Sequence, residues 1–268
     1  MGKKWTNTHS FILCAYGESE YLEQCIKSLM AQKVRSWIII ATSTPNGHIL
    51  GLAHKYDIPV RINTGQKGLA GDWNFALKQG DTKLVTLAHQ DDIYLPGYTK
   101  AILRAQEKST DPIIFFTDYA EIRGEGVVRK GKLLTVKRLL LSPLHFPVFW
   151  NSIFIRRRIL SLGSAICCPS VTLVKGKVPE PLFEDNMESN IDWQAWERLS
   201  RQKGAFVYVP RILMEHRIHE GSTTTRLLTE NARGKEDYYM FCRFWPEPAA
   251  KAIMLFYSRN EKYNRTSE

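Results

Sequence analysis

Short apolar runs alternate with amphipathic stretches through the first 120 residues of the chain. The runs have the length of buried strands, and the stretches place their apolar residues on one helical face. Strands are predicted over residues 10–15, 37–41, 60–62, 84–88 and 113–117, and helices over 20–31, 69–77 and 97–107. Strand and helix alternation with short loops predicts an α/β fold with a mostly parallel sheet covered by helices on both faces.

The second half is less regular. Residues 133–162 are apolar and basic and are predicted to contain helices, and residues 192–202 form a further predicted helix. Two short strands are expected over 205–209 and 212–215. The tail over 224–257 has a helical pattern and many aromatic residues. The length suits one α/β domain over residues 1–223 followed by a helical C-terminal extension over 224–268.

The charge is concentrated in one stretch. The chain carries a formal net charge of +10, and residues 126–179 contain ten Lys and Arg residues and no Asp or Glu. Such a block attracts phosphate-bearing partners, which include an anionic membrane surface, a lipid diphosphate and a nucleic acid. The alternative is a solvated basic face without a specific partner.

The remaining composition concerns the compartment. Five cysteines without metal-site spacing fit reduced thiols in a cytoplasm. No apolar run reaches the roughly 20 residues that span a bilayer, and the N-terminal residues contain no apolar signal core. We therefore expect a cytoplasmic protein that is either free or peripheral at the inner membrane face.

The strongest chemical feature follows the predicted strand over 84–88. It is a run of polar residues that contains His89, Gln90, Asp91 and Asp92. Residues i and i+2 of a strand face the same side, so His89 and Asp91 can point at one ligand, and Asp92 can join them if the chain turns. Ligands of open α/β sheets bind at this edge. The pattern favours a divalent cation that holds a phosphate, and the alternative is a pair of solvated turn residues or helix caps.

Three segments, in their order and spacing, resemble the family 2 glycosyltransferases with the GT-A fold. The first covers residues 15–29 and looks like the loop after strand one and the helix that follows it. The second runs from Asn63 through Asp72, Trp73 and Asn74 to residues 89–92. The third starts at Asp192-Trp193 and ends with the segment 216–223. Together the three cover about residues 8–225.

The resemblance implies an enzyme. It implies a nucleotide-sugar half over about residues 8–120 and an acceptor half over about 121–223. The implied reaction is an inverting, metal-dependent transfer of a sugar from a nucleoside-diphosphate sugar, with a UDP-sugar as first choice. The implied acceptor is a glycan, a glycoprotein or a lipid-linked molecule, in the bacterial type of surface-glycan assembly.

The resemblance also assigns residues. Asp91, His89 and His219 are the implied metal ligands. His89 stands where the family has its first Asp, and an imidazole favours Mn²⁺ over Mg²⁺. The implied nucleotide contacts are Ala15, Tyr16, Glu18, Thr42, Asn74, His89, Gln90, Asp92 and Arg217. After the second strand, hydroxyl residues replace the acidic pair that the family uses to recognise the base.

Asp192 matches the general base of the family. A carboxylate on the acceptor side can take the proton of the attacking hydroxyl. The alternative is that Asp192 only caps the helix that begins there, with Glu184 and Asp185 as rival bases.

Other classes of protein remain open at this point. The charge alone is compatible with a nucleic-acid-binding protein, although no known binding motif is present, which makes nucleic acid a poor candidate partner. A nucleotidyltransferase would also use Asp91 and a metal. A glycosyltransferase-like scaffold without activity could use its aromatic tail as a homo-oligomer interface.

Overall fold

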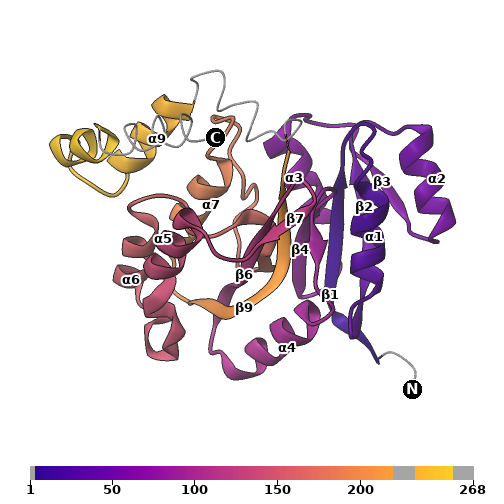
Figure 1. The fold of residues 1–268 in the computed structure, drawn as a ribbon, viewed down its shortest axis with the longest axis horizontal. Coiled ribbons are helices and arrows are strands. Elements are labelled where there is room, and N and C mark those ends of the chain that lie inside the picture. The colour runs from indigo at the N-terminus through magenta and orange to yellow at the C-terminus, as the bar shows by residue number, and fades with distance from the viewer. Residues whose placement is uncertain (1–3, 220–232, 256–268) are drawn as a thin grey trace.

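The computed structural model describes residues 4–219 and 233–255 (Figure 1). Its strands are β1 (Lys4–Ala15), β2 (Val34–Thr42), β3 (Val60–Ile62), β4 (Leu84–His89), β5 (Ile93–Tyr94), β6 (Pro112–Arg123), β7 (Gly126–Val128), β8 (Val171–Val174) and β9 (Ala205–Ile218). Its α-helices are α1 (Leu22–Met30), α2 (Gly47–Lys55), α3 (Leu69–Gln79), α4 (Tyr98–Lys108), α5 (Lys132–Leu141), α6 (Ile153–Leu160), α7 (Ile191–Ser200) and α9 (Arg233–Cys242), and residues 247–255 are also helical. The short 3₁₀ helices are η1 (Ser142–His145), η2 (Pro147–Phe149) and η3 (Cys168–Ser170).

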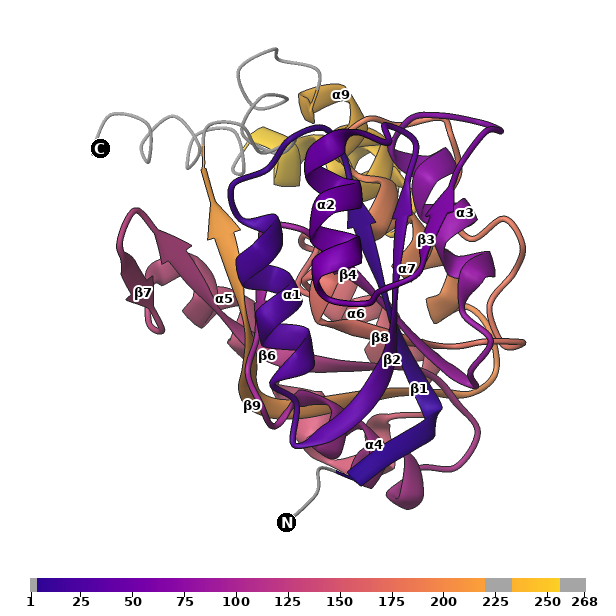
Figure 2. The same ribbon diagram turned by 90° about the vertical axis from the view of Figure 1, so that its right-hand side faces the viewer.

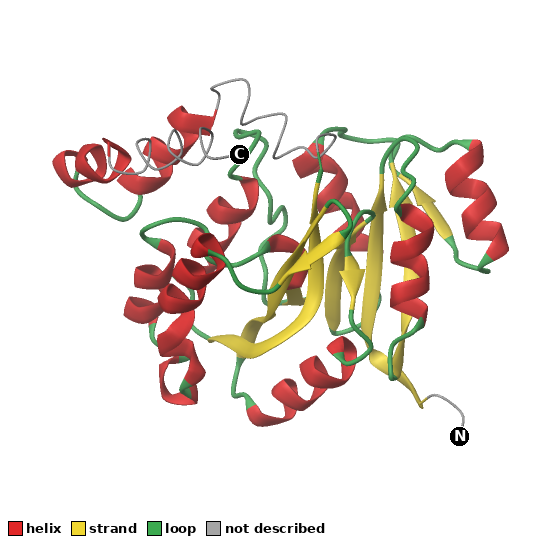
Figure 3. Ribbon diagram, in the orientation of Figure 1, coloured by secondary structure: helices red, strands yellow, loops and turns green. Residues whose placement is uncertain are grey.

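One mixed sheet runs through the molecule, with helices around it (Figure 3). The strand order is β3-β2-β1-β4-β8-β6-β9-β5, and β7 pairs with β6. The predicted α/β architecture is therefore confirmed, and the predicted parallel pairing holds for β3, β2, β1 and β4 and again for β6 and β9. Strand β8 is antiparallel to both of its neighbours, β4 and β6. Its first residues, together with η3, therefore lie at the carboxyl edge of β4.

The alternating pattern of the strands explains how both faces of the sheet are covered. On β1, Ile12 belongs to a core shared with α3 and α7, whereas Phe11 and Leu13 belong to a second core shared with α1 and α4. Figure 2 shows α1 and α3 on opposite sides of β1 and β2. All three of these residues are fully buried, and each such side chain contributes about 1.5–3 kcal/mol of burial free energy.

Several elements differ from the sequence-based expectation. Helix α2 and strands β5, β7 and β8 were not predicted by the hydrophobic pattern. The two short strands expected over 205–209 and 212–215 are one strand, β9. Its register against β6 shifts between the pairs Thr117–Val209 and Asp118–Ile212, so Pro210 lies in a bulge that needs no N–H donor.

The described part of the C-terminal extension packs on α7. Met240 and Phe241 of α9 are fully buried in the same core as Trp193. Glu236 of α9 accepts hydrogen bonds from the backbone N–H groups of residues 188–190, just before α7. The helical prediction is confirmed for the described part of the tail. The predicted boundary at 223/224 lies outside the described residues, as does the end of the third motif segment, residues 220–223.

Candidate active site

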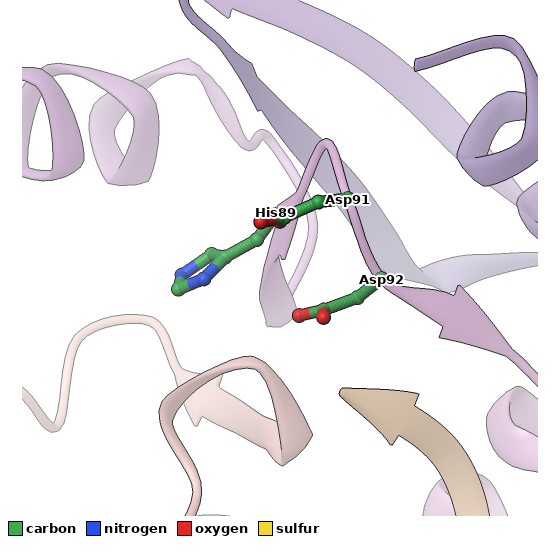
Figure 4. Close-up of side chains that lie close together, drawn as sticks. All are labelled: His89, Asp91 and Asp92. Carbon is green, nitrogen blue, oxygen red and sulfur yellow. The ribbon is translucent and has the colours of Figure 1, made fainter. Parts of the chain in front are cut away.

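The polar turn after β4 lies at the carboxyl edge of the parallel strands. His89 is the last residue of β4, and Asp92 precedes β5. The backbone N–H of Asp92 donates to the carbonyl oxygen of His89, which closes the turn (3.3 Å). One ligand atom from each of His89, Asp91 and Asp92 lies within 4.8 Å of the others. Figure 4 shows the three side chains projecting to the same side of the turn.

The end of β9 completes this cluster because β9 pairs with β5, the strand that follows the turn. His219 Nε2 is hydrogen-bonded to Asp91 Oδ2 (3.0 Å). Asp92 is fully buried, and its Oδ1 contacts His216 Nδ1 and accepts the backbone N–H of Arg217, both at 2.9 Å. Burial alone would lower the pKa of His216, but the adjacent Asp92 carboxylate raises it above the ordinary histidine value. The structure thus brings together four predicted residues, His89, Asp91, Asp92 and His219, and adds His216.

Two buried atoms of the cluster have no hydrogen-bond partner in the structure, His89 Nε2 and Asp92 Oδ2. Buried polar atoms are normally hydrogen-bonded. Two such atoms without a partner, beside the carboxylate of Asp91, therefore indicate a site that binds a ligand. The His89 ring stacks on Trp73, with 5.1 Å between the ring centroids. Burial lowers the pKa of His89, although the carboxylates of Asp92 and Asp91 act in the opposite direction. A neutral imidazole nitrogen and two carboxylates are donors that suit a divalent cation, so these residues fit a metal ion.

Arg217 joins the turn to the start of α1. Its Nε donates to the carbonyl oxygen of Asp91 (3.0 Å), and its Nη2 donates to Gln24 Oε1 (2.7 Å). Its guanidinium group lies over the ring of Tyr21, 4.2 Å from the centroid. Arg217 was assigned from the sequence, whereas Tyr21 and Gln24 were not, although both lie in the first motif segment.

The loop after β1 lies beside the turn. Gln90 donates through Nε2 to the carbonyl oxygen of Tyr16 and accepts the Tyr16 N–H through Oε1, both at 3.0 Å. Ala15 is the buried last residue of β1, while Tyr16 and Glu18 are exposed. These four predicted residues therefore lie on one rim of the carboxyl edge.

Asp192 lies in the first turn of α7. Asn190 occupies the N-cap position, so Asp192 is the second helical residue and not the cap, and its Oδ1 accepts the N–H of Trp193 (2.8 Å). Burial lowers the pKa of His89, and the charge of Asp192 opposes this effect less than the charges of Asp92 and Asp91 do. The rival carboxylates are engaged with other side chains: Glu184 pairs with Arg198 (3.0 Å), and Asp185 accepts from Gln66 (2.8 Å).

Two predicted nucleotide contacts have other partners in the structure. The buried Thr42 hydroxyl accepts the N–H of Thr44 (3.1 Å) and shapes the loop after β2. The Asn74 side chain accepts the N–H groups of residues 182 and 183 and donates to the carbonyl oxygen of Phe183. Neither side chain is brought to the turn after β4 by these contacts.

The loop after β2 nevertheless has a carboxylate beside it. Asp72 of α3 accepts hydrogen bonds from Ser43 (2.9 Å) and from Asn63 (2.7 Å). The sequence analysis missed this role of Asp72, because the residue follows Ser43 by 29 positions and only the fold joins them.

A metal-type cluster at the carboxyl edge of the sheet lies where open α/β folds bind their ligands, so the fold and the site define an α/β ligand-binding protein. The glycosyl transferase family 2 model matches residues 10–171, which is more than half of the chain. The chain belongs to this family. No curated protein sequence matches the chain.

Solved structures of glycosyltransferases share the fold at low sequence identity. TarS 1–349 of Staphylococcus aureus, in complex with UDP-GlcNAc, has a TM-score of 0.60 and 14% identity over 92% of this chain and 70% of its own. The mannosyltransferase PcManGT of Pyrobaculum calidifontis, with GDP-Man and Mn²⁺, gives 0.57 and 11% over 92% and 69%. Glucosyl-3-phosphoglycerate synthase of Mycobacterium tuberculosis, with Mn²⁺ and UDP-Glc, gives 0.56 and 16% over 88% and 79%.

These comparisons confirm a glycosyltransferase with the GT-A fold. They favour a glycosyltransferase over the nucleic-acid-binding protein and the nucleotidyltransferase that the sequence left open. In the described part of the chain, no helix has both the length and the apolar character needed to cross a bilayer.

Proposed function

We propose that the chain transfers a sugar from a nucleoside-diphosphate sugar to an acceptor hydroxyl, with inversion at the sugar carbon and with a divalent cation. The observation that carries this proposal is the pair of unpartnered buried atoms, His89 Nε2 and Asp92 Oδ2, beside Asp91 and His219.

The proposed cation ligands are Asp91, His89 and His219. A divalent cation supplies a Lewis acid that neutralises the charge developing on the leaving diphosphate. Since two of the three ligands are imidazoles, Mn²⁺ should support higher activity than Mg²⁺, which prefers oxygen ligands. Asp92 orients the turn through its contacts with β9 and offers one further oxygen to the site.

The proposed donor site is the rim formed by residues 15–18, Gln90 and Arg217. Arg217 is held by Tyr21 and Gln24 close to the turn, where its positive charge favours a diphosphate. Thr42 and Asn74 act through the loops that they shape. The neighbours in complex with UDP-GlcNAc, UDP-Glc and GDP-Man support a nucleotide-sugar donor, and a UDP-sugar is our first choice.

The proposed base is Asp192. Its carboxylate accepts the proton of the acceptor hydroxyl as this hydroxyl attacks the sugar carbon from the face opposite the diphosphate. A single displacement of this kind inverts the configuration. The proposed acceptor is a glycan, a glycoprotein or a lipid-linked molecule of surface-glycan assembly.

A thermal-shift experiment tests donor and metal together. We expect UDP-GlcNAc, UDP-Glc or GDP-Man to raise the melting temperature of the purified chain in the presence of Mn²⁺, because a ligand at about 100 times its Kd stabilises a fold by about 2.7 kcal/mol. Asp91→Asn should remove the Mn²⁺-dependent part of the shift. Asp81→Asn, at an exposed position outside the site, is the matched control and should keep it. A shift that does not need Mn²⁺, or that survives Asp91→Asn, would contradict the proposed site.

A further inference from the structure

Helix α5 turns two of its cations inward and exposes three of its apolar side chains to solvent. Its two central cations point inward: Lys137 Nζ donates to the Tyr119 hydroxyl (2.9 Å), and Arg138 pairs with Asp118 (2.8 Å). Leu134 and Leu141 are buried, but three further apolar residues, Leu133, Val136 and Leu139, are exposed, Leu139 to 71%. A helix on a water-facing surface normally has the opposite arrangement, so the outer face of α5 is suited to an apolar environment.

The apolar exposure continues over the next elements. Phe146 and Val148, in and around η2, are 61% and 78% exposed, and Phe154 near the start of α6 is 70% exposed. Helix α5 packs against η1 and α6, and η1 packs against η2, so these elements are neighbours in space. Figure 1 shows α5 and α6 on the same side of the molecule, away from β3. We call the exposed side chains of residues 133, 136, 139, 146, 148 and 154 the α5–α6 surface.

The structure revises the picture of one basic face. Most cations of the acid-free block are engaged: Arg129 with Glu215, Arg157 with Glu197, Lys177 with Asp111, and Lys175 and Arg156 with backbone carbonyl oxygens. Lys130 and Lys132 are exposed, and neither has an ion-pair partner among the described residues. Both are next to or in the first turn of α5, so the two free lysines flank the α5–α6 surface.

We propose that the α5–α6 surface docks the enzyme on an anionic lipid bilayer. Exposed aliphatic and aromatic side chains on an amphipathic helix enter the boundary between headgroups and acyl chains, and nearby lysines are attracted to anionic headgroups. Charge argues against a second copy of the chain as the occupant. Two such surfaces face to face would bring their lysines together, with no acidic residue over residues 126–179 to compensate.

The surface also has a functional position. Burial alone would lower the pKa of Lys137, on the inner side of α5, but the adjacent Tyr119 raises it. The docking surface is therefore the outer side of a helix of the acceptor half whose inner side contacts Tyr119 and Asp118 of β6. On the proposed function, this arrangement presents the acceptor half of the enzyme to acceptors anchored in the bilayer.

Vesicle flotation of the purified full chain tests the docking surface without any need for activity. We expect the chain to float with vesicles of phosphatidylcholine and phosphatidylglycerol, and to float less with phosphatidylcholine alone. The double variant Leu139→Ser/Phe154→Ser should lower vesicle affinity at least about tenfold, because each side chain loses the apolar area that it would bury in lipid. The double variant Lys130→Gln/Lys132→Gln should lower the preference for anionic vesicles by about fivefold per lysine.

Leu50→Ser is the matched control, since Leu50 is an exposed apolar residue of α2. It should float like the unchanged protein. The proposal is overturned if the unchanged chain does not float with anionic vesicles, or if the Leu139→Ser/Phe154→Ser variant floats equally well. It is also overturned if sedimentation shows a dimer that this variant dissociates, because a second copy would then cover the surface. Retained donor-dependent thermal shifts in the variant would show that the site is intact, so a failure of docking is separable from a failure of the proposed function.

Discussion

Two carboxylates on α7 have opposite surroundings. Glu197, in the middle of the helix, is fully buried and contacts Arg157 (2.7 Å), Arg201 (2.5 Å) and Arg243 (3.1 Å). Asp192, in the first turn, is half-buried and is the proposed base. In the proposed metal site, His89 and Asp92 leave buried atoms without hydrogen bonds. Glu197 is thus saturated by protein partners, whereas the proposed metal site keeps two buried polar atoms to which no described residue is hydrogen-bonded.

The Glu197 cluster joins three separate parts of the acceptor half and the C-terminal extension. Arg157 comes from α6, Arg201 from the end of α7, and Arg243 from the turn after α9. Burial alone would raise the pKa of Glu197, but the three arginines hold it below the ordinary glutamate value. The comparison predicts that a change at Glu197 affects stability, while a change at Asp192 affects turnover.

The largest expected effect belongs to Asp192→Asn. Loss of a general base lowers kcat by roughly 10²- to 10⁴-fold, while the free energy of unfolding should change by less than about 1 kcal/mol, the value of a charge near a helix N-terminus. The checks are sugar transfer under single-turnover conditions and urea denaturation. Asp185→Asn removes a rival carboxylate and should retain activity. A large loss of stability in Asp192→Asn with substantial remaining turnover would reverse the roles assigned to the two carboxylates.

Glu197→Gln should destabilise the protein. Removing one partner of a buried ion pair leaves uncompensated charge and lowers the free energy of unfolding by about 3–5 kcal/mol. Because the folded-state pKa of Glu197 is lowered, its contribution is present above the ordinary value of 4.5 and is lost as the pH falls through the folded-state pKa. Urea denaturation at neutral and acidic pH measures this, and the variant should lose less stability than the unchanged protein as the pH falls.

Glu184→Gln is the matched control for Glu197→Gln. Glu184 pairs with Arg198, but its side chain is 39% exposed, so the change should cost less than about 1 kcal/mol. Equal effects of the two substitutions would mean that the three arginines do not distinguish Glu197 from an exposed ion pair.

The regular elements of the first half could be predicted because their local patterns agree with their packing. β4 is an apolar run buried on both faces, and α3 buries Trp73 and Leu77 at helical spacing. Helix α2 was missed because its apolar pattern is short. Its N-cap Asn46, whose side chain accepts the N–H of Ile49 (2.9 Å), was the available signal.

The orientation of α5 could not be predicted from its own sequence. Local amphipathicity places leucines inside and cations outside. In the structure Leu134 and Leu141 are buried, but Lys137 and Arg138 also turn inward, because β6 supplies Asp118 and Tyr119 as partners. Asp118 and Tyr119 precede their partners Arg138 and Lys137 by 20 and 18 positions, and only the packing of β6 against α5 reveals these contacts.

The candidate site was predictable in its central part only. The residues of the turn after β4 are adjacent in sequence, and their spacing already indicates a shared ligand. His216 was quoted within a motif but was given no role. Its contact with Asp92 spans 124 positions and depends on the antiparallel pairing of β5 with β9.

Among the changes in the proposed active site, His216→Asn should have the smallest effect. His216 is hydrogen-bonded to Asp92 Oδ1 and so helps to aim the unpartnered Oδ2 into the cluster. Residues that orient metal ligands typically change metal affinity by about 10- to 100-fold when replaced. Titration of the chain with Mn²⁺ measures this, and His54→Asn, at an exposed position on α2, is the control that should keep the affinity. An unchanged affinity in His216→Asn would mean that the Arg217 N–H alone fixes Asp92, and that β9 positions the site through its backbone.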